Sequence, residues 1–412
     1  MRHRVVLSVL ILATLAVPAS SGPPAAPPEL EGFKKELKHF DLKIRLAAVG
    51  KVEALGGPLA ATVLLTALDD EEWEVRIRIL EALGRLKEPE TAEALARAAV
   101  DGEIILVRAA AVRALRDLGQ TDTAKRILRG AAAAKKPEVK VRALDAAGAL
   151  AQPADATDVF PFLMNRETAV RAAACRALGG TKSPAALPYL SKMVREKEPA
   201  VTAAAIEALG MIGGGEALDS LLECALTAED PYFVERIARA YRAIGTALSA
   251  PFLAGKAAEE KKADRRAKIV RVLSGLEETA AGESLAGFLA DPDPTVRAWT
   301  ARGVGRAAHA GAAEALERLM DSDPDGTVRR MALEARFAVA PEKEGRAAVL
   351  VKALRNDRPE IRIRASVLAA RERCLPAVPA LAPLMDAGDW RESTAAIIAV
   401  GILGHAGEVE LV

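Results

Sequence analysis

The apolar positions of this chain follow a helical period and come in pairs of short stretches. In residues 183–213, the first stretch places apolar residues three or four positions apart, at Leu187, Leu190, Met193 and Val194. The second stretch does the same at Val201, Ala205, Ala208 and Leu209. Such spacing predicts two amphipathic helices. The dipeptide Glu198-Pro199 separates them, because the residue before a proline is disfavoured in the helical conformation. This stretch is therefore predicted to be a helical hairpin.

The same hairpin recurs along the chain with a period of about 31 residues. In most copies an arginine follows an apolar residue at the start of the second helix. These marker residues are Arg45, Arg76, Arg108, Arg142, Arg171, Arg297, Arg329, Arg362 and Arg391. Between Arg171 and Arg297 the frame is kept by Thr202, Glu235 and Arg266. The period thus continues through the whole middle of the chain.

A period held over most of the chain excludes a single globular core. In a stacked repeat, each unit buries its apolar face only against its neighbours. We therefore expect an all-α fold, a right-handed α-solenoid (superhelix) of about twelve helical hairpins. Glycines that follow the last apolar residue of a second helix, as in Leu83-Gly84 and Leu178-Gly179, are expected to end that helix.

The turn between the two helices has a recurring composition of its own. Its clearest copies are Asp291-Pro292-Asp293-Pro294 and Asp323-Pro324-Asp325-Gly326. An aspartate just before a helix can accept hydrogen bonds from the free amides of the first turn and favours the positive end of the helix dipole. The following arginine is expected to reach the aspartate of an adjacent repeat, which would form a ladder along the stack. The acids assigned to this structural ladder are Asp70, Asp293 and Asp323. Thr202 and Glu235 replace the arginine, so the ladder is predicted to be interrupted there.

Period, turn and arginine together give the pattern D-P-x-x-x-V-R-x-x-A-x-x-A-L-G. This pattern resembles the short HEAT repeat, the HEAT-like form that is also found in phycobilisome lyases. The resemblance covers residues 31–412, about twelve units. It implies an armadillo-type solenoid, and the repeat is shorter than the roughly 40–47 residues usual for HEAT and armadillo units. Ankyrin and tetratricopeptide repeats have their own motifs, which do not occur in this sequence.

The first residues are predicted to lie outside the repeat array. Arg2 and Arg4 precede the uncharged apolar run Val5–Val17, and small residues follow it. This arrangement is typical of a secretory signal peptide over residues 1–21, with cleavage after Ala19 or after Ser21. The apolar run is shorter than the ~20 residues that span a bilayer as a helix. The alternative is an uncleaved N-terminal anchor.

Residues 22–30 form a Pro-rich spacer, and residues 31–412 form the repeat array. The array is less regular over residues 246–275. A run of mixed charges there, residues 255–268, is expected to be a solvated face or a long loop. The chain stops where a new first helix would begin, so either a short cap closes the stack or the sequence is a fragment that lacks its C-terminal cap.

Composition and charge narrow the function. Apolar residues make up 51% of the chain but aromatic residues only 3%, which suits closely packed helices built from alanine, leucine and valine. The 57 basic residues nearly balance 56 acidic ones. Loss of residues 1–21 removes two arginines, so the net charge of the mature chain is near −1. A neutral chain lacks the basic surface that phosphate neutralisation requires, and we expect no nucleic-acid partner.

The residue types that carry catalysis or bind metals occur in none of the usual patterns. His39, His309 and His405 are followed by phenylalanine or alanine, whereas the HEAT-repeat di-iron hydroxylases use repeated His-Glu dipeptides. The sequence has no C-x-x-C pair, no G-x-S-x-G and no Walker motif. We therefore predict no catalytic, cofactor-binding or metal-binding residue. The three cysteines, Cys175, Cys224 and Cys374, are predicted to be buried and to pack as small apolar side chains. A disulfide bridge between Cys175 and Cys224 is the alternative for that pair.

These features predict an exported, non-catalytic, monomeric scaffold in the periplasm or outside the cell. Its second helices would line a concave face that holds a protein partner, with no membrane insertion after signal cleavage. Trp73, Trp299 and Trp390 lie close to marker arginines, and we predict either partner contacts or packing in the turn for them. The alternative is an enzyme of the phycobilin-lyase type, or another HEAT-repeat enzyme, by resemblance alone. An export signal opposes the lyase, and the net charge opposes a HEAT-like DNA glycosylase.

Overall fold

The computed structural model describes residues 29–119 and 122–407, and within these ranges the chain is α-helical without a strand. Short first helices alternate with longer second helices. The first helices are α1 (Glu29–Glu36), α3 (Gly57–Leu65), α5 (Ala92–Asp101), α7 (Thr123–Ala133), α9 (Ala156–Val159), α11 (Leu187–Met193), α13 (Gly215–Thr227), α15 (Thr246–Glu259), α17 (Thr279–Leu285), α19 (Ala313–Ser322), α21 (Lys343–Leu354) and α23 (Val378–Leu381). Short 3-10 turns precede or extend several of them, such as η3 (Phe160–Met164), η5 (Ala286–Ala290) and η8 (Ala382–Asp386).

The second helices carry the even numbers. They are α2 (Leu42–Leu55), α4 (Trp73–Leu86), α6 (Ile105–Leu118), α8 (Pro137–Leu150), α10 (Thr168–Thr181), α12 (Pro199–Ile212), α14 (Pro231–Ile244), α16 (Ala263–Leu273), α18 (Pro294–Arg306), α20 (Gly326–Ala338), α22 (Pro359–Arg371) and α24 (Trp390–Gly407). The predicted all-α solenoid of about twelve helical hairpins is confirmed.

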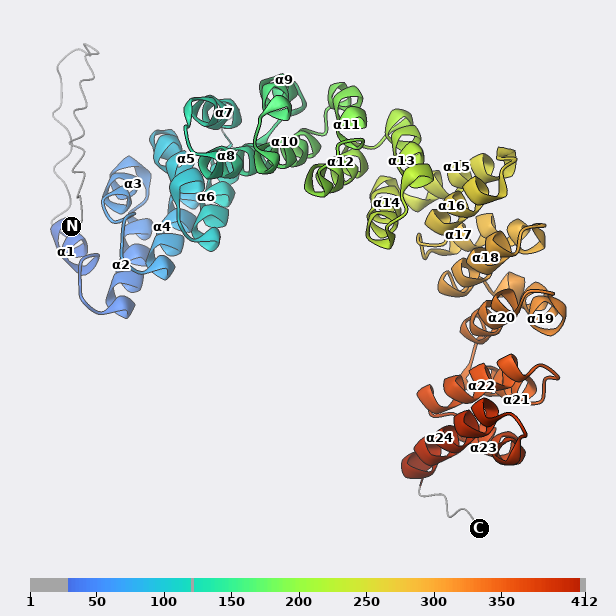
Figure 1. Cartoon of the computed structure of the whole chain (residues 1–412). Helices are drawn as coiled ribbons and strands as arrows, with labels where there is room; N and C mark the ends of the chain where they lie inside the picture. Colours follow the sequence, from blue (N-terminus) through green and yellow to red (C-terminus); the bar gives the residue numbers. More distant parts are fainter. Residues whose placement is uncertain (1–28, 120–121, 408–412) are drawn as a thin grey trace, which may run out of the picture.

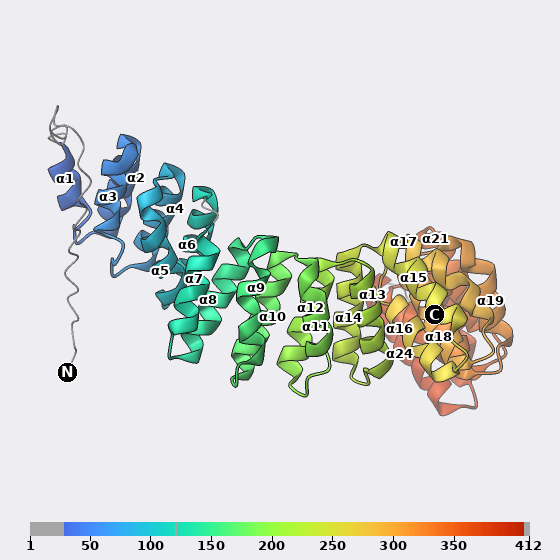
Figure 2. The same cartoon turned by 90° about the horizontal axis from the view of Figure 1, so that it is seen from above.

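The hairpins stack into an open arch. In Figure 1 the odd-numbered helices form the outer side of the arch and the even-numbered helices its inner side. The two ends of the chain lie at opposite ends of the stack, and the view from above shows that the row also turns sideways along its length (Figure 2). Each hairpin therefore meets only its two neighbours along most of the chain, as a solenoid requires.

One apolar core runs through the whole stack, from Leu30 in α1 to Leu403 in α24. Five second helices, α4, α6, α10, α12 and α22, bury a valine or isoleucine near their start and a leucine near their end, as Val170 and Leu178 do in α10. Alanines fill the faces between neighbouring second helices. Because these side chains are small, the backbones of adjacent hairpins come close together.

Glycines set the closest approaches. Six second helices have glycine as their twelfth residue, and five of these glycines lie against an alanine of the next second helix: Gly84 on Ala114, Gly148 on Ala177, Gly179 on Ala208, Gly210 on Ala240 and Gly305 on Ala335. A Cβ atom on these glycines would lie 2.6–2.9 Å from the Cα atom of that alanine. The prediction that these glycines end the second helices is wrong, because each lies inside its helix and makes room for the neighbouring backbone. Gly119, in contrast, does end α6 in the left-handed conformation, at φ 72°.

Three pairs of second helices touch along less of their length than the others: α6 with α8, α14 with α16, and α20 with α22. In these joints the twelfth residue is large, namely Arg116, Arg242 and Phe337. The Arg116 Nη2 donates to the Ala149 carbonyl at 3.0 Å, and the Arg242 Nη1 donates to the Gly275 carbonyl at 2.7 Å. A large side chain in place of glycine holds the helices apart, and the guanidinium bridges the space.

In the third joint, between α20 and α22, the twelfth residue of α20 is Phe337, which has no guanidinium to bridge the space. A hollow of about 720 Å³ opens beside Phe337, and Arg346, Cys374 and Leu375 are among the residues that line it. Figure 1 shows the stretched connection between α20 and the last two hairpins.

The stretch expected to be irregular forms an ordinary hairpin of α15 and α16. Its mixed-charge run belongs to the two helices and to the short turn 260–262 between them, so it is a solvated face rather than a long loop. The local irregularity is Pro251 inside α15, close to its start.

Two substitutions of glycine by alanine should have opposite effects on stability. Gly148→Ala places a methyl group 2.6 Å from the Ala177 Cα atom, and overpacking of this kind costs about 1–3 kcal/mol. Gly255→Ala, inside α15, meets no atom within 4 Å and should stabilise the helix by up to about 1 kcal/mol. Guanidinium denaturation followed by circular dichroism measures both. Equal effects of the two substitutions would contradict the close packing of α8 on α10.

Candidate partner-binding surface

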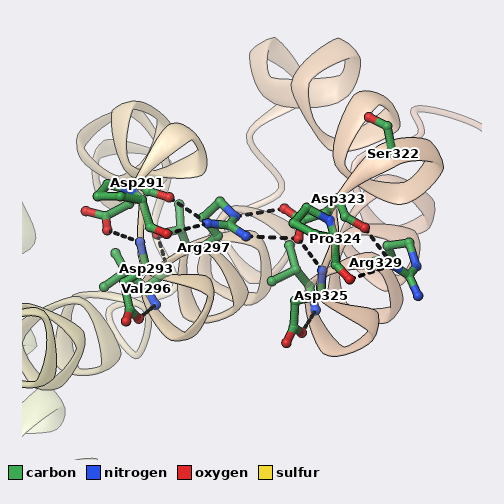
Figure 3. A network of polar contacts seen from close by, with 12 residues as sticks. Asp291, Asp293, Val296, Arg297, Ser322, Asp323, Pro324, Asp325 and Arg329 are labelled. Atoms are coloured by element: carbon green, nitrogen blue, oxygen red, sulfur yellow. Dashed lines mark hydrogen bonds and ion pairs between the residues drawn. The ribbon is translucent and has the colours of Figure 1, made fainter.

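The arginine near the start of a second helix connects two turns. The Nη1 of Arg297 donates to the carbonyls of Asp291 and Pro292 in its own turn, at 2.8 and 3.0 Å. Its Nε and Nη2 donate to the two carboxylate oxygens of Asp323 in the next turn, at 2.7 and 2.9 Å. Figure 3 shows this side chain lying between the two turns. The guanidinium fork thus satisfies buried carbonyls on one side and a buried carboxylate on the other.

The same two-sided contact recurs along the stack. A guanidinium donates to the carbonyl six residues earlier in Arg45, Arg108, Arg171, Arg266, Arg329 and Arg362. All of these except Arg108 also contact a carboxylate of the following hairpin. The pairs are Arg45–Asp70, Arg171–Glu196, Arg266–Asp291, Arg329–Glu360 and Arg362–Glu392. The acid is an aspartate in some pairs and a glutamate in others, and its separation in sequence from the arginine also varies. Glu392, the acid of the last pair, is buried, with an exposed fraction of 2%.

The ladder residue is the fourth residue of a second helix, whose backbone N–H donates to the carbonyl of the helix cap. In α8 this residue is Lys140, and in α24 it is Ser393. Arg142 therefore lies two residues past the ladder position and Arg391 two residues before it. Arg391 is exposed and lies over the Trp390 ring at 5.6 Å. In the other helices the ladder residue follows the third residue of the helix, whereas Arg142 follows Val141, the fifth residue of α8, and Arg391 follows Trp390, the first residue of α24.

Two other predicted residues, Arg76 and Asp293, have different contacts from those expected. Arg76 holds the ladder position, but its side chain has no hydrogen bond or ion pair within residues 29–119 and 122–407, and its Nε is buried. Asp293 caps α18: its Oδ1 accepts from the backbone N–H groups of Thr295 and Val296 at 2.9 and 3.1 Å. The ladder acid of that turn is Asp291.

In the middle of the stack the ladder has no arginine. Thr202 donates its hydroxyl to the Glu196 carbonyl at 3.0 Å, so it keeps the contact with its own turn and makes none to the next. The fourth residue of α14 is Val234, and the neighbouring Glu235 pairs with Arg242 at 3.1 Å. The stack from α12 to α16 is therefore held by apolar packing and by polar contacts outside the ladder, which include Glu207 with Arg236, Lys268 with Glu229, and Arg242 with the Gly275 carbonyl.

Electrostatics supports a structural role for the ladder. The hydrogen bond with Asp323 raises the pKa of Arg297, and the one with Asp291 raises the pKa of Arg266. Burial alone would raise the pKa of Asp291, but hydrogen bonds from Arg266 and from the Asp293 backbone lower it. Backbone N–H groups of Val328 and Thr327 lower the pKa of Asp325, which caps α20. All four groups are charged at neutral pH, and none is free to bind a partner.

The ninth residue of each second helix faces the inner side of the arch, because the first helices cover the opposite side of these helices (Figure 1). This inner row reads Gly50, Glu81, Arg113, Asp145, Arg176, Glu207, Arg239, Arg271, Arg302, Glu334, Val367 and Ile398. Each of these residues is exposed or half-buried. Every hairpin contributes a residue to this row, and all of them except Gly50 contribute a side chain.

Most charges of the inner row have an ion-pair partner, either in the row or on a neighbouring position. Arg176 pairs with Asp145 at 2.9 Å and Arg113 with Glu81 at 3.9 Å. Glu207 pairs with Arg236, and Glu334 pairs with Arg364 at 2.6 Å. At the end of the row, Val367 and Ile398 are 45% and 56% exposed. The row therefore changes from paired charges to apolar side chains towards α24.

The three tryptophans do not lie on one rim. Trp73 and Trp390 are the first residues of α4 and α24 and are 37% and 70% exposed. Trp299, the sixth residue of α18, is half-buried on the inner side next to the row. The guanidinium carbons of Arg271 and Arg302 lie 5.1 and 5.2 Å from its ring centre. Sequence reasoning identified Trp299 but missed Arg271, because Arg271 belongs to the stretch that looked irregular.

The cysteines and the remaining polar groups offer no reactive centre. Cys175 and Cys224 are free and buried, and burial raises the pKa of each thiol to about 12. Within the described ranges, no three histidine, cysteine or acidic side chains come together in a group suited to a metal ion. In the same part of the chain no helix combines the length and the apolar character needed to span a bilayer.

Comparisons with known proteins agree with this architecture. A family model for HEAT repeats matches residues 30–116, 159–242 and 250–336. No curated protein matches the sequence. A solved engineered protein is similar over 92% of this chain and 99% of its own length, with 18% identity and a TM-score of 0.31. Kap121p bound to Pho4p is similar over 91% of this chain, with 12% identity and a TM-score of 0.48.

Yeast importin-beta, Kap95p, is similar over 91% of this chain and 60% of its own length, with 14% identity and a TM-score of 0.45. The chain spans 49% of the length of Kap121p, about half of that karyopherin. At these identities the likeness concerns the solenoid fold alone.

Loss of one ladder arginine should destabilise the stack strongly. Arg297→Met leaves the carboxylate of Asp323 buried without its partner, and breaking a buried pair in this way costs about 3–5 kcal/mol. The same substitution at Arg318, whose pair with Glu314 is exposed, should change the free energy of unfolding by about 0.5 kcal/mol or less. Chemical denaturation of both variants measures the difference, and a small loss in both would contradict the structural role of the ladder.

The lowered pKa values of Asp291 and Asp325 predict acid sensitivity. A group whose pKa is lower in the folded state stabilises the protein above its unfolded pKa of about 3.9, and this contribution is lost as the pH falls through the folded pKa. The melting temperature should therefore fall steeply below about pH 4. Asp325→Asn keeps a capping side chain without the charge and should flatten this fall. A melting profile unchanged by the substitution would show that Asp325 does not contribute.

Proposed function

Because this chain belongs to the HEAT-repeat family, we propose that it is a non-catalytic scaffold that holds a protein partner along the inner side of its arch. The observation that carries the proposal is the inner row. Within the described residues, eleven of the twelve second helices place one solvent-facing side chain each on a single continuous surface, and α2 contributes Gly50. Extended concave surfaces of this kind are what solenoids use for binding.

The composition of the inner row suits a protein partner. Charges of both signs alternate along much of it, and exposed apolar side chains follow at its end. Mixed charges of this kind give specificity for a complementary protein surface rather than general affinity for a polyanion. The ladder lies at the turns and keeps the spacing of the row, so the surface is preformed before a partner arrives.

The described residues give no support to the alternative enzyme. His39 accepts a hydrogen bond from the backbone N–H of Asp41 at 3.0 Å, and His309 lies at the start of the 3-10 turn before α19, far along the stack. Neither of them belongs, within the described residues, to a group of three histidine, cysteine or acidic side chains that could hold a metal ion. We carry the scaffold forward as the single proposed function.

Photo-crosslinking tests where a partner binds. A photoreactive residue replaces Arg113 or Val367 on the inner row, or Arg97 or Arg318 on the first helices, where both arginines are exposed. The mature protein is mixed with extract of its own cell envelope, and crosslinked species are identified by mass spectrometry. We expect one protein to be crosslinked from the inner positions and not from the outer ones. Crosslinks from the outer positions alone, or turnover of a small molecule by a purified protein with a bound chromophore, would contradict the proposal.

The place of action belongs to the same proposal. The predicted signal peptide, residues 1–21, lies outside the described residues, and it would deliver the scaffold to the periplasm or the cell exterior. The intact mass of the protein purified from the envelope or medium should correspond to a chain that begins at Ser20 or Gly22. Recovery of the full mass from Met1 in the membrane fraction would instead support an N-terminal anchor.

A further inference from the structure

We propose that the inner surface around Trp299 is the docking site for an extended, acidic segment of the protein partner. This inference rests on the proposed scaffold function and names the chemistry that one part of the inner row recognises. The site comprises Arg271, Trp299 and Arg302 with the hollows on either side of the tryptophan, on α14 to α20.

The charge pairing of the inner row fails here and at no other charged position of the row. Three successive helices, α14, α16 and α18, place Arg239, Arg271 and Arg302 at their ninth positions. Arg239 lies 4.0 Å from Glu235, a carboxylate that Arg242 also engages. Among the described residues, no carboxylate lies within ion-pair distance of the Arg271 or Arg302 guanidinium. Two guanidiniums without an ion pair, one half-buried and one exposed, favour an anionic ligand.

Trp299 holds these two guanidiniums in fixed positions. Its ring lies beside both of them, an arrangement stabilised by the attraction of a cation to an aromatic face. Because each guanidinium carbon is just over 5 Å from the same ring centre, the two are at most about 10 Å apart. In an extended peptide, alternate side chains point the same way and lie about 7 Å apart. Two carboxylates at alternate positions can therefore each meet one guanidinium, with both oxygens engaged.

The hollows beside Trp299 accept apolar side chains next to those carboxylates. One, of about 350 Å³, lies between α18 and α20 and has Ala298, Trp299 and Met331 in its wall. The other, of about 270 Å³, lies towards α14 and has Val234 and Ala238 in its wall. The complementary ligand is thus an extended chain with acidic residues at alternate positions and an apolar residue beside them.

The limits of the site favour a peptide over a polyanion. Glu207 precedes the three arginines in the inner row, and Glu334 follows them. The Asp325 carboxylate stands at the rim of the larger hollow. A nucleic acid or an anionic polysaccharide would need a longer basic stripe without interruptions by acidic groups. A short acidic segment fits between these two glutamates.

Tryptophan fluorescence can test this site alone. Trp73→Phe and Trp390→Phe leave Trp299 as the single tryptophan of the protein. The probe is a short synthetic peptide with glutamate at two alternate positions and leucine at the next alternate position; its counterpart has glutamine for glutamate. We expect the glutamate peptide to change the Trp299 emission and the glutamine peptide to bind at least about tenfold more weakly, with affinity falling as salt rises.

A matched pair of double variants separates the site from general electrostatics. In the single-tryptophan protein, Arg271→Gln with Arg302→Gln should weaken binding of the glutamate peptide about tenfold or more. Arg113→Gln with Arg176→Gln removes the same charge from the same helix position, but from arginines that already have acidic partners, and should leave binding unchanged. Circular dichroism checks that both variants are folded. Equal losses in the two variants, or equal binding of the two peptides, would overturn the proposal.

Two further outcomes would also overturn it. A single-stranded oligonucleotide that binds more tightly than the glutamate peptide would identify a polyanion site. Self-association that the Arg271→Gln, Arg302→Gln variant abolishes, seen by light scattering, would identify a second copy of this chain as the occupant. The two proposals can also be told apart. If positions 113 and 367 crosslink the partner, the scaffold function is supported. If the Arg271→Gln, Arg302→Gln variant then retains full binding of that partner, this docking site is wrong while the scaffold function remains.

Discussion

The distance between one second helix and the next is the constraint on which the rest of this structure depends. No hairpin has a core of its own, so stability comes from burying alanine-rich faces of adjacent helices against each other. Where the twelfth residue is glycine, as at Gly179, the backbones meet closely. Where it is Arg116, Arg242 or Phe337, the helices stand further apart and the stack changes its contacts. One residue per repeat therefore regulates how tightly the arch is built.

The polar ladder solves a different problem at the edge of the same interface. Turns between helices leave carbonyls without helical partners, and burial would make these costly. A guanidinium such as that of Arg297 donates to these carbonyls and to the acid of the next turn at once. The ladder thus keeps neighbouring hairpins in register, and its own charges are paired with one another. The charges of the inner row stay available for recognition, and only around Trp299 do they lack partners within the described chain.

Part of this surface was predictable from the sequence and part was not. The ladder arginines could be recognised from the period, and the helix caps from the composition of the turn, because both depend on residues close together in sequence. The pairing of Arg329 with Glu360, or of Arg362 with Glu392, was hidden, since the acid lies 30 or 31 residues away and need not occupy a fixed place in the pattern. The register of α8 was also hidden, because Arg142 was taken for the ladder residue in place of Lys140.

The sequence by itself determined the fold class, the number of hairpins and the absence of the usual catalytic motifs. Helix periodicity, proline at the first position of several second helices and aspartate caps act within a few residues, so they can be recognised without coordinates. Only the tertiary structure decided what each glycine does, which arginines lack an acid, and that Arg271, Trp299 and Arg302 come together. These features depend on which side chains meet across neighbouring repeats, and a one-dimensional pattern contains the spacing of repeats but not the distance between their backbones.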